Sequence, residues 1–164
     1  MNAKFYLTLG LFYVVMTGCH FSVGTKKDLT TGLSVNYNGF TLQDAVLVDN
    51  HNSKMKNNVV HLDTTFGVVF TGIENYKVKD DKVFPSCEIS IKDKSGKLLN
   101  NIPNILGNTS EQGANPVDAR TLTATVRLHA PDYSVGNTYH VIITVLDREE
   151  PKNKIVAEAD IAVQ

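Results

Sequence analysis

The chain has 164 residues, with 16 basic and 17 acidic side chains and a formal net charge of −1. This near neutrality excludes the basic surplus that proteins use to hold nucleic acid or a polybasic membrane contact. Tryptophan is absent, and valine, isoleucine, threonine, asparagine and aspartate are plentiful, which favours strands and turns over helices. The composition therefore predicts an all-β domain without a nucleic-acid partner.

The first 18 residues have the features of a secretory signal peptide. Lys4 supplies positive charge, and Phe5 to Met16 form a run of 12 apolar or weakly polar residues. A helix that crosses a bilayer needs about 20 such residues, so this run is too short to span one. A short apolar run after a positive start and before small residues is typical of a cleaved signal. We therefore expect residues 1–18 to be removed.

The four residues Met16-Thr17-Gly18-Cys19 resemble the lipobox of bacterial lipoproteins, although Met16 stands where that family usually has leucine. The resemblance implies that diacylglycerol is attached to the Cys19 thiol, that cleavage occurs just before this residue and that the new amine is acylated. Two or more acyl chains hold a protein lastingly at a membrane. The resemblance thus places the protein in the bacterial cell envelope, anchored at the outer membrane and facing the periplasm or the cell surface.

Residues 20–32 show no periodicity and contain Gly24 and Gly32. We interpret residues 19–32 as the lipidated cysteine followed by a flexible linker. The folded domain is then predicted to occupy residues 33–164.

From residue 33 onward, apolar residues recur in short segments, most of them at every second position, which predicts β-strands. These segments are 33–37, 45–48, 59–62, 66–70, 87–91, 122–128, 139–145 and 157–163. Residues 99–120 break this rhythm with Pro103, Gly107 and Pro116, and predict a long irregular crossing. No stretch shows a convincing helical period.

The last third of the chain also predicts a pairing. Placing Leu128 opposite Tyr139 and Val126 opposite Val141 puts both apolar sets on one face, so we expect these two segments to form a hairpin. Seven or eight short strands at such spacings are typical of an antiparallel β-sandwich.

The segments GNTYHVIITVLD and IVAEADIAV resemble the last two strands of immunoglobulin-like domains. Tyr139 stands where those domains often place a corner tyrosine. The resemblance implies an immunoglobulin-like β-sandwich, here without the usual inter-sheet cysteine pair and core tryptophan.

No motif predicts a catalytic centre, a cofactor site or a metal site. The glycines form no phosphate-binding loop, and no serine lies between glycines as in a nucleophile elbow. Cys87 shares a predicted strand face with Ile89 and Ile91, where a thiol stays protonated and inert. With Cys19 lipidated, Cys87 has no cysteine to pair with, so we predict no disulfide.

Two histidines of the predicted hairpin are the nearest approach to a pair of metal ligands. His129 and His140 would lie diagonally on its outer face, about 7–8 Å apart. Arg127 would sit opposite His140, and no third ligand is evident, so we interpret both as solvated surface side chains. Carbohydrate binding usually relies on aromatic platforms, for which Tyr76 and Tyr133 in predicted loops are the remaining candidates.

These observations predict a small cell-envelope lipoprotein that acts as a membrane-tethered binding or assembly module and not as an enzyme. Its partners would be the membrane, through Cys19, and an envelope protein or glycan. The alternative is an extracytoplasmic hydrolase or an accessory subunit of an envelope enzyme, including a carbohydrate-binding one. The predicted partner-binding loop carries Ile102, Ile105 and Leu106, which either plug an open end of the sandwich or form a contact surface.

Overall fold

The computed structural model describes residues 22–164, so the predicted signal peptide and Cys19 lie outside the described residues. The described part contains ten strands and two short helices. The strands are β1 (Val23–Lys27), β2 (Ser34–Asn38), β3 (Asp44–Val48), β4 (Val59–Val60), β5 (Thr65–Thr71), β6 (Pro85–Lys92), β7 (Leu98–Ile102), β8 (Thr121–Arg127), β9 (Thr138–Asp147) and β10 (Lys154–Val163). The helices are α1 (Asn108–Gln112) and a 3₁₀ helix, η1 (Asp118–Arg120).

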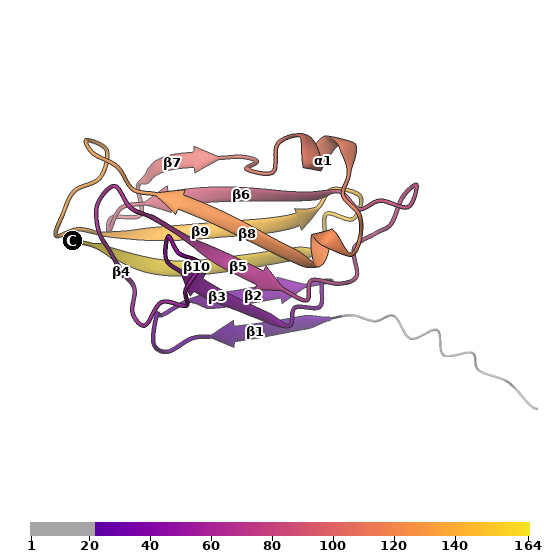
Figure 1. Ribbon diagram of the computed structural model, residues 1–164, viewed down its shortest axis with the longest axis horizontal. Coiled ribbons are helices and arrows are strands. Elements are labelled where there is room, and N and C mark those ends of the chain that lie inside the picture. Colours follow the sequence, from indigo (N-terminus) through magenta and orange to yellow (C-terminus); the bar gives the residue numbers. More distant parts are fainter. Residues whose placement is uncertain (1–21) are drawn as a thin grey trace, which may run out of the picture.

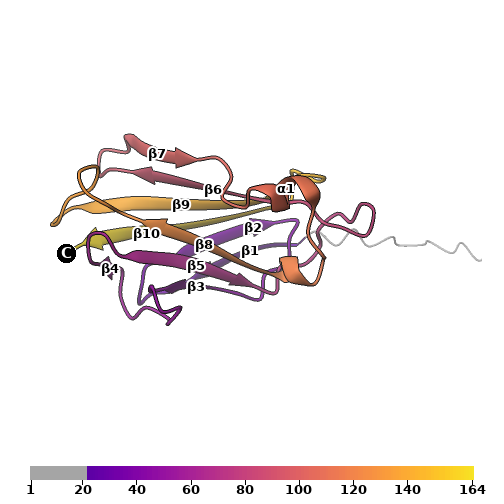
Figure 2. The ribbon, with the colours of Figure 1, turned by 45° about the horizontal axis from the view of Figure 1, so that its top comes forward.

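The strands form two sheets that face each other (Figure 1, Figure 2). The larger sheet has the order β1-β2-β10-β9-β6-β7, with the short β4 pairing alongside β10, and the smaller sheet has the order β3-β5-β8. All these pairs are antiparallel except β4 with β10. The structure therefore confirms the predicted all-β antiparallel sandwich, and each of the eight predicted apolar segments contributes a strand.

The core lies between the two sheets and is built from alternate side chains of their strands. On β9, Val141, Ile143 and Val145 are each at most 3% exposed, while the residues between them are half-buried on the opposite face. On β5, Phe66 and Phe70 close the core from the smaller sheet and are at most 2% exposed. Burial of these side chains is the main favourable contribution to folding, because apolar area removed from water stabilises the folded state.

The predicted hairpin between segments 122–128 and 139–145 is wrong. β8 pairs with β5 in the smaller sheet, with Val126 opposite Phe66, whereas β9 lies between β6 and β10 in the larger sheet. The intervening residues 128–137 cross from one sheet to the other. Both strands still turn their apolar face to the core, because the alternation of side chains determines which face is buried. The same alternation does not specify which strand pairs with which.

The predicted flexible linker is wrong for residues 23–27. These residues form β1, which pairs with β2 along its whole length. The segment lacks an apolar period because β1 is an edge strand and one of its core-facing positions is Gly24. The ring of Tyr37, directly opposite on β2, covers this glycine so closely that a Cβ there would lie 2.2 Å from the tyrosine hydroxyl. The folded domain thus includes β1 and does not start at Leu33.

The segment 99–120 is more regular than predicted. It contains most of the exposed edge strand β7, together with α1 and η1. The buried hydroxyl of Ser110 in α1 donates a hydrogen bond to the carbonyl of Pro85, 2.6 Å away, and so fixes the helix to the start of β6. A helix of five residues is too short to give a sequence period. Among residues 22–164, no helix is long and apolar enough to cross a membrane.

Neighbouring isoleucines on β9 provide a test of this register. Ile143→Asn places an amide in the core, and we expect the melting temperature to fall by about 10 °C, because about 3 kcal/mol of packing and solvation is lost. Ile142→Asn, the same change on the half-buried outer face, should shift it by a small fraction of that. Calorimetry or thermal circular dichroism measures both variants, and equal shifts would contradict the register.

Candidate functional site

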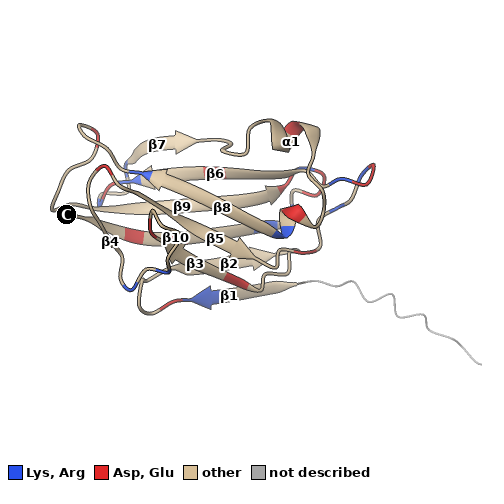
Figure 3. Cartoon of the chain, in the orientation of Figure 1, with Lys and Arg blue, Asp and Glu red and all other residues tan. Residues whose placement is uncertain are grey.

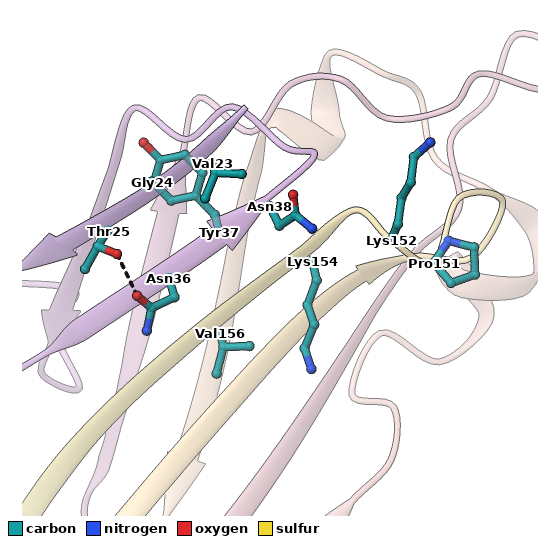
Figure 4. A pocket seen from close by; sticks show the side chains of 10 residues that line it. All are labelled: Val23, Gly24, Thr25, Asn36, Tyr37, Asn38, Pro151, Lys152, Lys154 and Val156. Atoms are coloured by element: carbon teal, nitrogen blue, oxygen red, sulfur yellow. Dashed lines mark hydrogen bonds between the residues drawn. The ribbon is translucent and has the colours of Figure 1, made fainter. Parts of the chain in front are cut away.

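A hollow of about 450 Å³ opens on the outer face of the larger sheet, where β1, β2 and the start of β10 lie side by side (Figure 4). We call it the β1 hollow. The strand register sets two rows of outer-face residues across it: Val23, Asn38 and Lys154 in the first row, and Thr25, Asn36 and Val156 in the second. Three segments that are distant in the sequence therefore build one surface.

Apolar side chains form much of the lining of the β1 hollow. Val156 lies in the second row, Val23 is 62% exposed at the beginning of β1, and Pro151 closes one side from the turn before β10. Covering exposed apolar surface of this kind with a ligand removes it from water, which is energetically favourable.

Amide and hydroxyl groups lie among these apolar side chains. The Thr25 hydroxyl donates a hydrogen bond to Asn36 Oδ1 at 2.8 Å (Figure 4). Asn38 Oδ1 is buried and has no hydrogen-bond partner among residues 22–164. Unpaired buried acceptors are unfavourable, so the side chain of Asn38 gains from any rearrangement that brings a donor to it.

Two ammonium groups give the β1 hollow a positive side. Lys152 lies 3.6 Å from Glu150, measured from Nζ to Oε2, whereas Lys154 forms no ion pair within the described part of the chain. A ligand that places a carboxylate or another acceptor next to apolar groups therefore fits the hollow best.

A second, smaller hollow of about 300 Å³ lies between the β5–β6 loop and the segment that leads into η1. We call it the loop hollow. Val78 and Val117, 55% and 71% exposed, line it from these two segments. At its edge the guanidinium group of Arg120 pairs with the carboxylate of Glu74.

A buried carboxylate holds the loops at this end of the sandwich. Asp147 is fully buried, and its oxygens accept hydrogen bonds from the backbone N–H groups of Lys77 at 2.6 Å and Glu149 at 3.0 Å. Hydrogen bonds to a charged acceptor are among the strongest in proteins. Burial and, to a smaller extent, the charge of Asp147 raise the pKa of the neighbouring Tyr76 hydroxyl well above its usual value.

The three residues of the predicted partner-binding loop are separated by the structure. Ile105 and Leu106 are half-buried and pack against the core, and the Ile105 N–H donates to the Cys87 carbonyl at 2.8 Å. Ile102 lies on the edge strand β7 and is 40% exposed. Of the two predicted alternatives, Ile105 and Leu106 therefore fit the one in which the loop side chains fold back onto the core. Of the three residues, Ile102 alone remains at the surface.

The predicted diagonal arrangement of His129 and His140 is wrong, because the hairpin that would place them so does not form. His140 lies on β9, where its Nδ1 is 2.8 Å from Asp160 Oδ1 and its Nε2 is 4.0 Å from Glu158 Oε2. His129 Nε2 lies 3.8 Å from Asp132 Oδ2. Within residues 22–164, no group of three or more histidine, cysteine or acidic side chains has an arrangement that could hold a metal ion.

Neither loop tyrosine offers an exposed ring for a sugar. The Tyr76 ring packs edge-on against Phe40, with the ring centres 4.7 Å apart. Tyr133 is 3% exposed and packs against Tyr139 at 5.0 Å. The Tyr139 hydroxyl in turn accepts a hydrogen bond from the Ser134 N–H at 2.8 Å, which ties the preceding loop to β9.

The β1 hollow has no signature in the sequence. Its lining comes from residues 23–25, 36–38 and 151–156, and no short motif joins them. The only local feature is that Val23, Thr25 and Lys27 stand at every second position, which places their side chains on one face of a strand.

Cys87 occupies the core position that its predicted strand implies. It is 1% exposed, and burial raises the pKa of its thiol to about 12, with a smaller contribution from the charge of Glu88. The thiolate is the reactive form of cysteine, so this environment keeps Cys87 unreactive at neutral pH.

The protection of Cys87 can be measured with a disulfide reagent at pH 8 on protein lacking the signal peptide. With Cys19 replaced by alanine, we expect no release of the chromophore over minutes in buffer and one equivalent after guanidinium is added, because only unfolding exposes the thiol. Val117→Cys, at an exposed position, serves as the positive control. Rapid reaction of Cys87 in buffer would contradict its placement in the core.

The comparisons with known proteins assign no family to this chain. No family model matches it, and no curated protein matches it. Among solved structures, it is similar to a superoxide reductase (neelaredoxin) from Ignicoccus hospitalis, with 12% sequence identity and a TM-score of 0.36, covering 75% of this chain and 82% of that chain. A likeness at this TM-score assigns neither an activity nor a site to the protein.

Proposed function

We propose that the protein is a cell-envelope lipoprotein, held at the outer membrane by lipid on Cys19, that binds another envelope protein through the β1 hollow. The observation that carries the proposal is the distance in sequence between anchor and hollow. Val23, the first residue of β1, lines the hollow and follows Cys19 by only four positions. The anchor and the binding surface are thus parts of one short stretch of chain.

Covalent geometry limits how far the hollow can lie from the anchor. Four residues span at most about 14 Å when fully extended. A lipidated Cys19 would hold the β1 hollow close to the headgroups, where it can meet proteins of the same membrane. This placement supports an assembly module better than one that samples the space far from the membrane.

The chemistry of the hollow supports a protein partner. Val23 and Val156 offer apolar contact, Asn36 offers an amide, and Lys154 offers an unpaired ammonium group. An extended segment with an acidic side chain beside apolar ones would satisfy all of these groups. No histidine or cysteine lines the hollow, and the proposal assigns no catalytic residue.

The anchor is tested by replacing its thiol. In a bacterial host, Cys19→Ala should abolish incorporation of a fatty-acid label and leave the protein out of the washed membrane fraction, because the lipid is attached to that sulfur. Cys87→Ala, the matched control, should keep both the label and the membrane association. Fatty-acid label on the Cys19→Ala protein would contradict the anchor.

The binding surface is tested on its outer face. Val156→Lys fills the β1 hollow with a further positive side chain, so we expect the envelope proteins that co-purify with the detergent-solubilised protein to be lost. Ile142→Lys, on the same face of the sheet but outside the hollow, should retain them. Both variants should melt close to the parent, and mass spectrometry identifies the partners. Unchanged recovery with Val156→Lys would contradict this surface.

A further inference from the structure

The end of the sandwich at which β1 begins also carries exposed valines on separate loops. A single row of paired residues marks this end across the larger sheet: Val23, Asn38, Lys154, Leu146 and Ser86. Beyond that row lie the β5–β6 loop, the β9–β10 turn and the two short helices, as Figure 2 shows. We call this the entry end of the sandwich.

Hydrogen bonds place Val78 and Val117 at the entry end. Val78 follows Lys77, whose N–H is held by Asp147 at the end of β9. Val117 is the residue before η1, and the Arg120 carbonyl of that helix accepts a hydrogen bond from Ile73 N–H at 3.0 Å. The two segments face each other across the loop hollow.

From this geometry we infer that the entry end rests on the bilayer, with Val78 and Val117 in contact with the membrane interface. The inference rests on the proposed lipid at Cys19. Cys19 and Val23 are four positions apart, at most about 14 Å of chain, so the anchor brings this end to the membrane surface. The opposite end, with the β8–β9 loop, lies a full strand length away (Figure 1).

The charges on the loops of the entry end do not form a cationic surface for lipid headgroups. Acidic and basic residues are mixed along its loops (Figure 3). Lys79 pairs with Glu149 at 3.2 Å, and Arg120 pairs with Glu74, so these cations are already neutralised by neighbours. Electrostatic attraction to anionic lipid through Lys79 and Arg120 is therefore weak. Exposed valines at the level of the headgroups gain from partial burial between lipids.

The absence of tryptophan from the sequence allows a direct test. Val117→Trp and Val78→Trp each introduce a single fluorophore at the entry end. Val135→Trp, at a position 62% exposed in the β8–β9 loop, is the matched control at the opposite end. The full-length lipidated proteins are reconstituted in phosphatidylethanolamine–phosphatidylglycerol vesicles with and without brominated acyl chains.

We expect brominated lipid to reduce emission about twofold at positions 78 and 117 and to leave position 135 unchanged, because bromine quenches only tryptophan that touches the acyl region. Vesicle flotation and the intact mass are recorded for each sample. Protein that carries the lipid and floats, yet shows no quenching at positions 78 and 117, overturns the contact and leaves the anchor standing. Protein without lipid that does not float overturns the anchor, and the contact with it.

Discussion

The buried carboxylate of Asp147 determines the shape of the entry end of the sandwich. It lies at the last residue of β9 and accepts backbone hydrogen bonds from the β5–β6 loop and the β9–β10 turn. A charge removed from water is tolerated only where such donors replace the lost solvent. Asp147 therefore fixes the loop that carries Val78 and the turn that carries Pro151 relative to β9, and the buried Asn153, which donates to the Asn75 carbonyl at 2.8 Å, adds a second tie between the same two segments.

The strands could be predicted from the sequence because a half-buried strand shows its buried face directly as a period of two. The partners of those strands could not. β8 and β9 each bury an alternating apolar face, and that pattern is the same whether the strands lie side by side or on opposite sheets. β1 escaped prediction for another reason: Tyr37 supplies the apolar cover at Gly24, so the strand needs no apolar residue of its own there.

The candidate site depends on tertiary structure to a greater degree than the strands do. Ile105 and Leu106 could be recognised in the sequence as apolar residues on a polar segment, and they pack on the core, as one of the two predicted alternatives has it. The β1 hollow had no comparable signal, since its rows join residues more than a hundred positions apart, such as Asn36 and Val156. Outer-face residues of a sheet meet only through strand pairing, which a single sequence leaves undetermined.

The close contact of Gly24 with Tyr37 couples the hollow to the interior. A methyl group at position 24 would occupy the space of the tyrosine ring, which packs against the core from its partly buried position. Any larger residue there would have to displace that ring, and so would change the β1 hollow and the packing beneath it together. Substitutions at the outer residues of β2 and β10 can therefore alter the hollow without disturbing the interior, whereas any side chain added at position 24 also moves the Tyr37 ring.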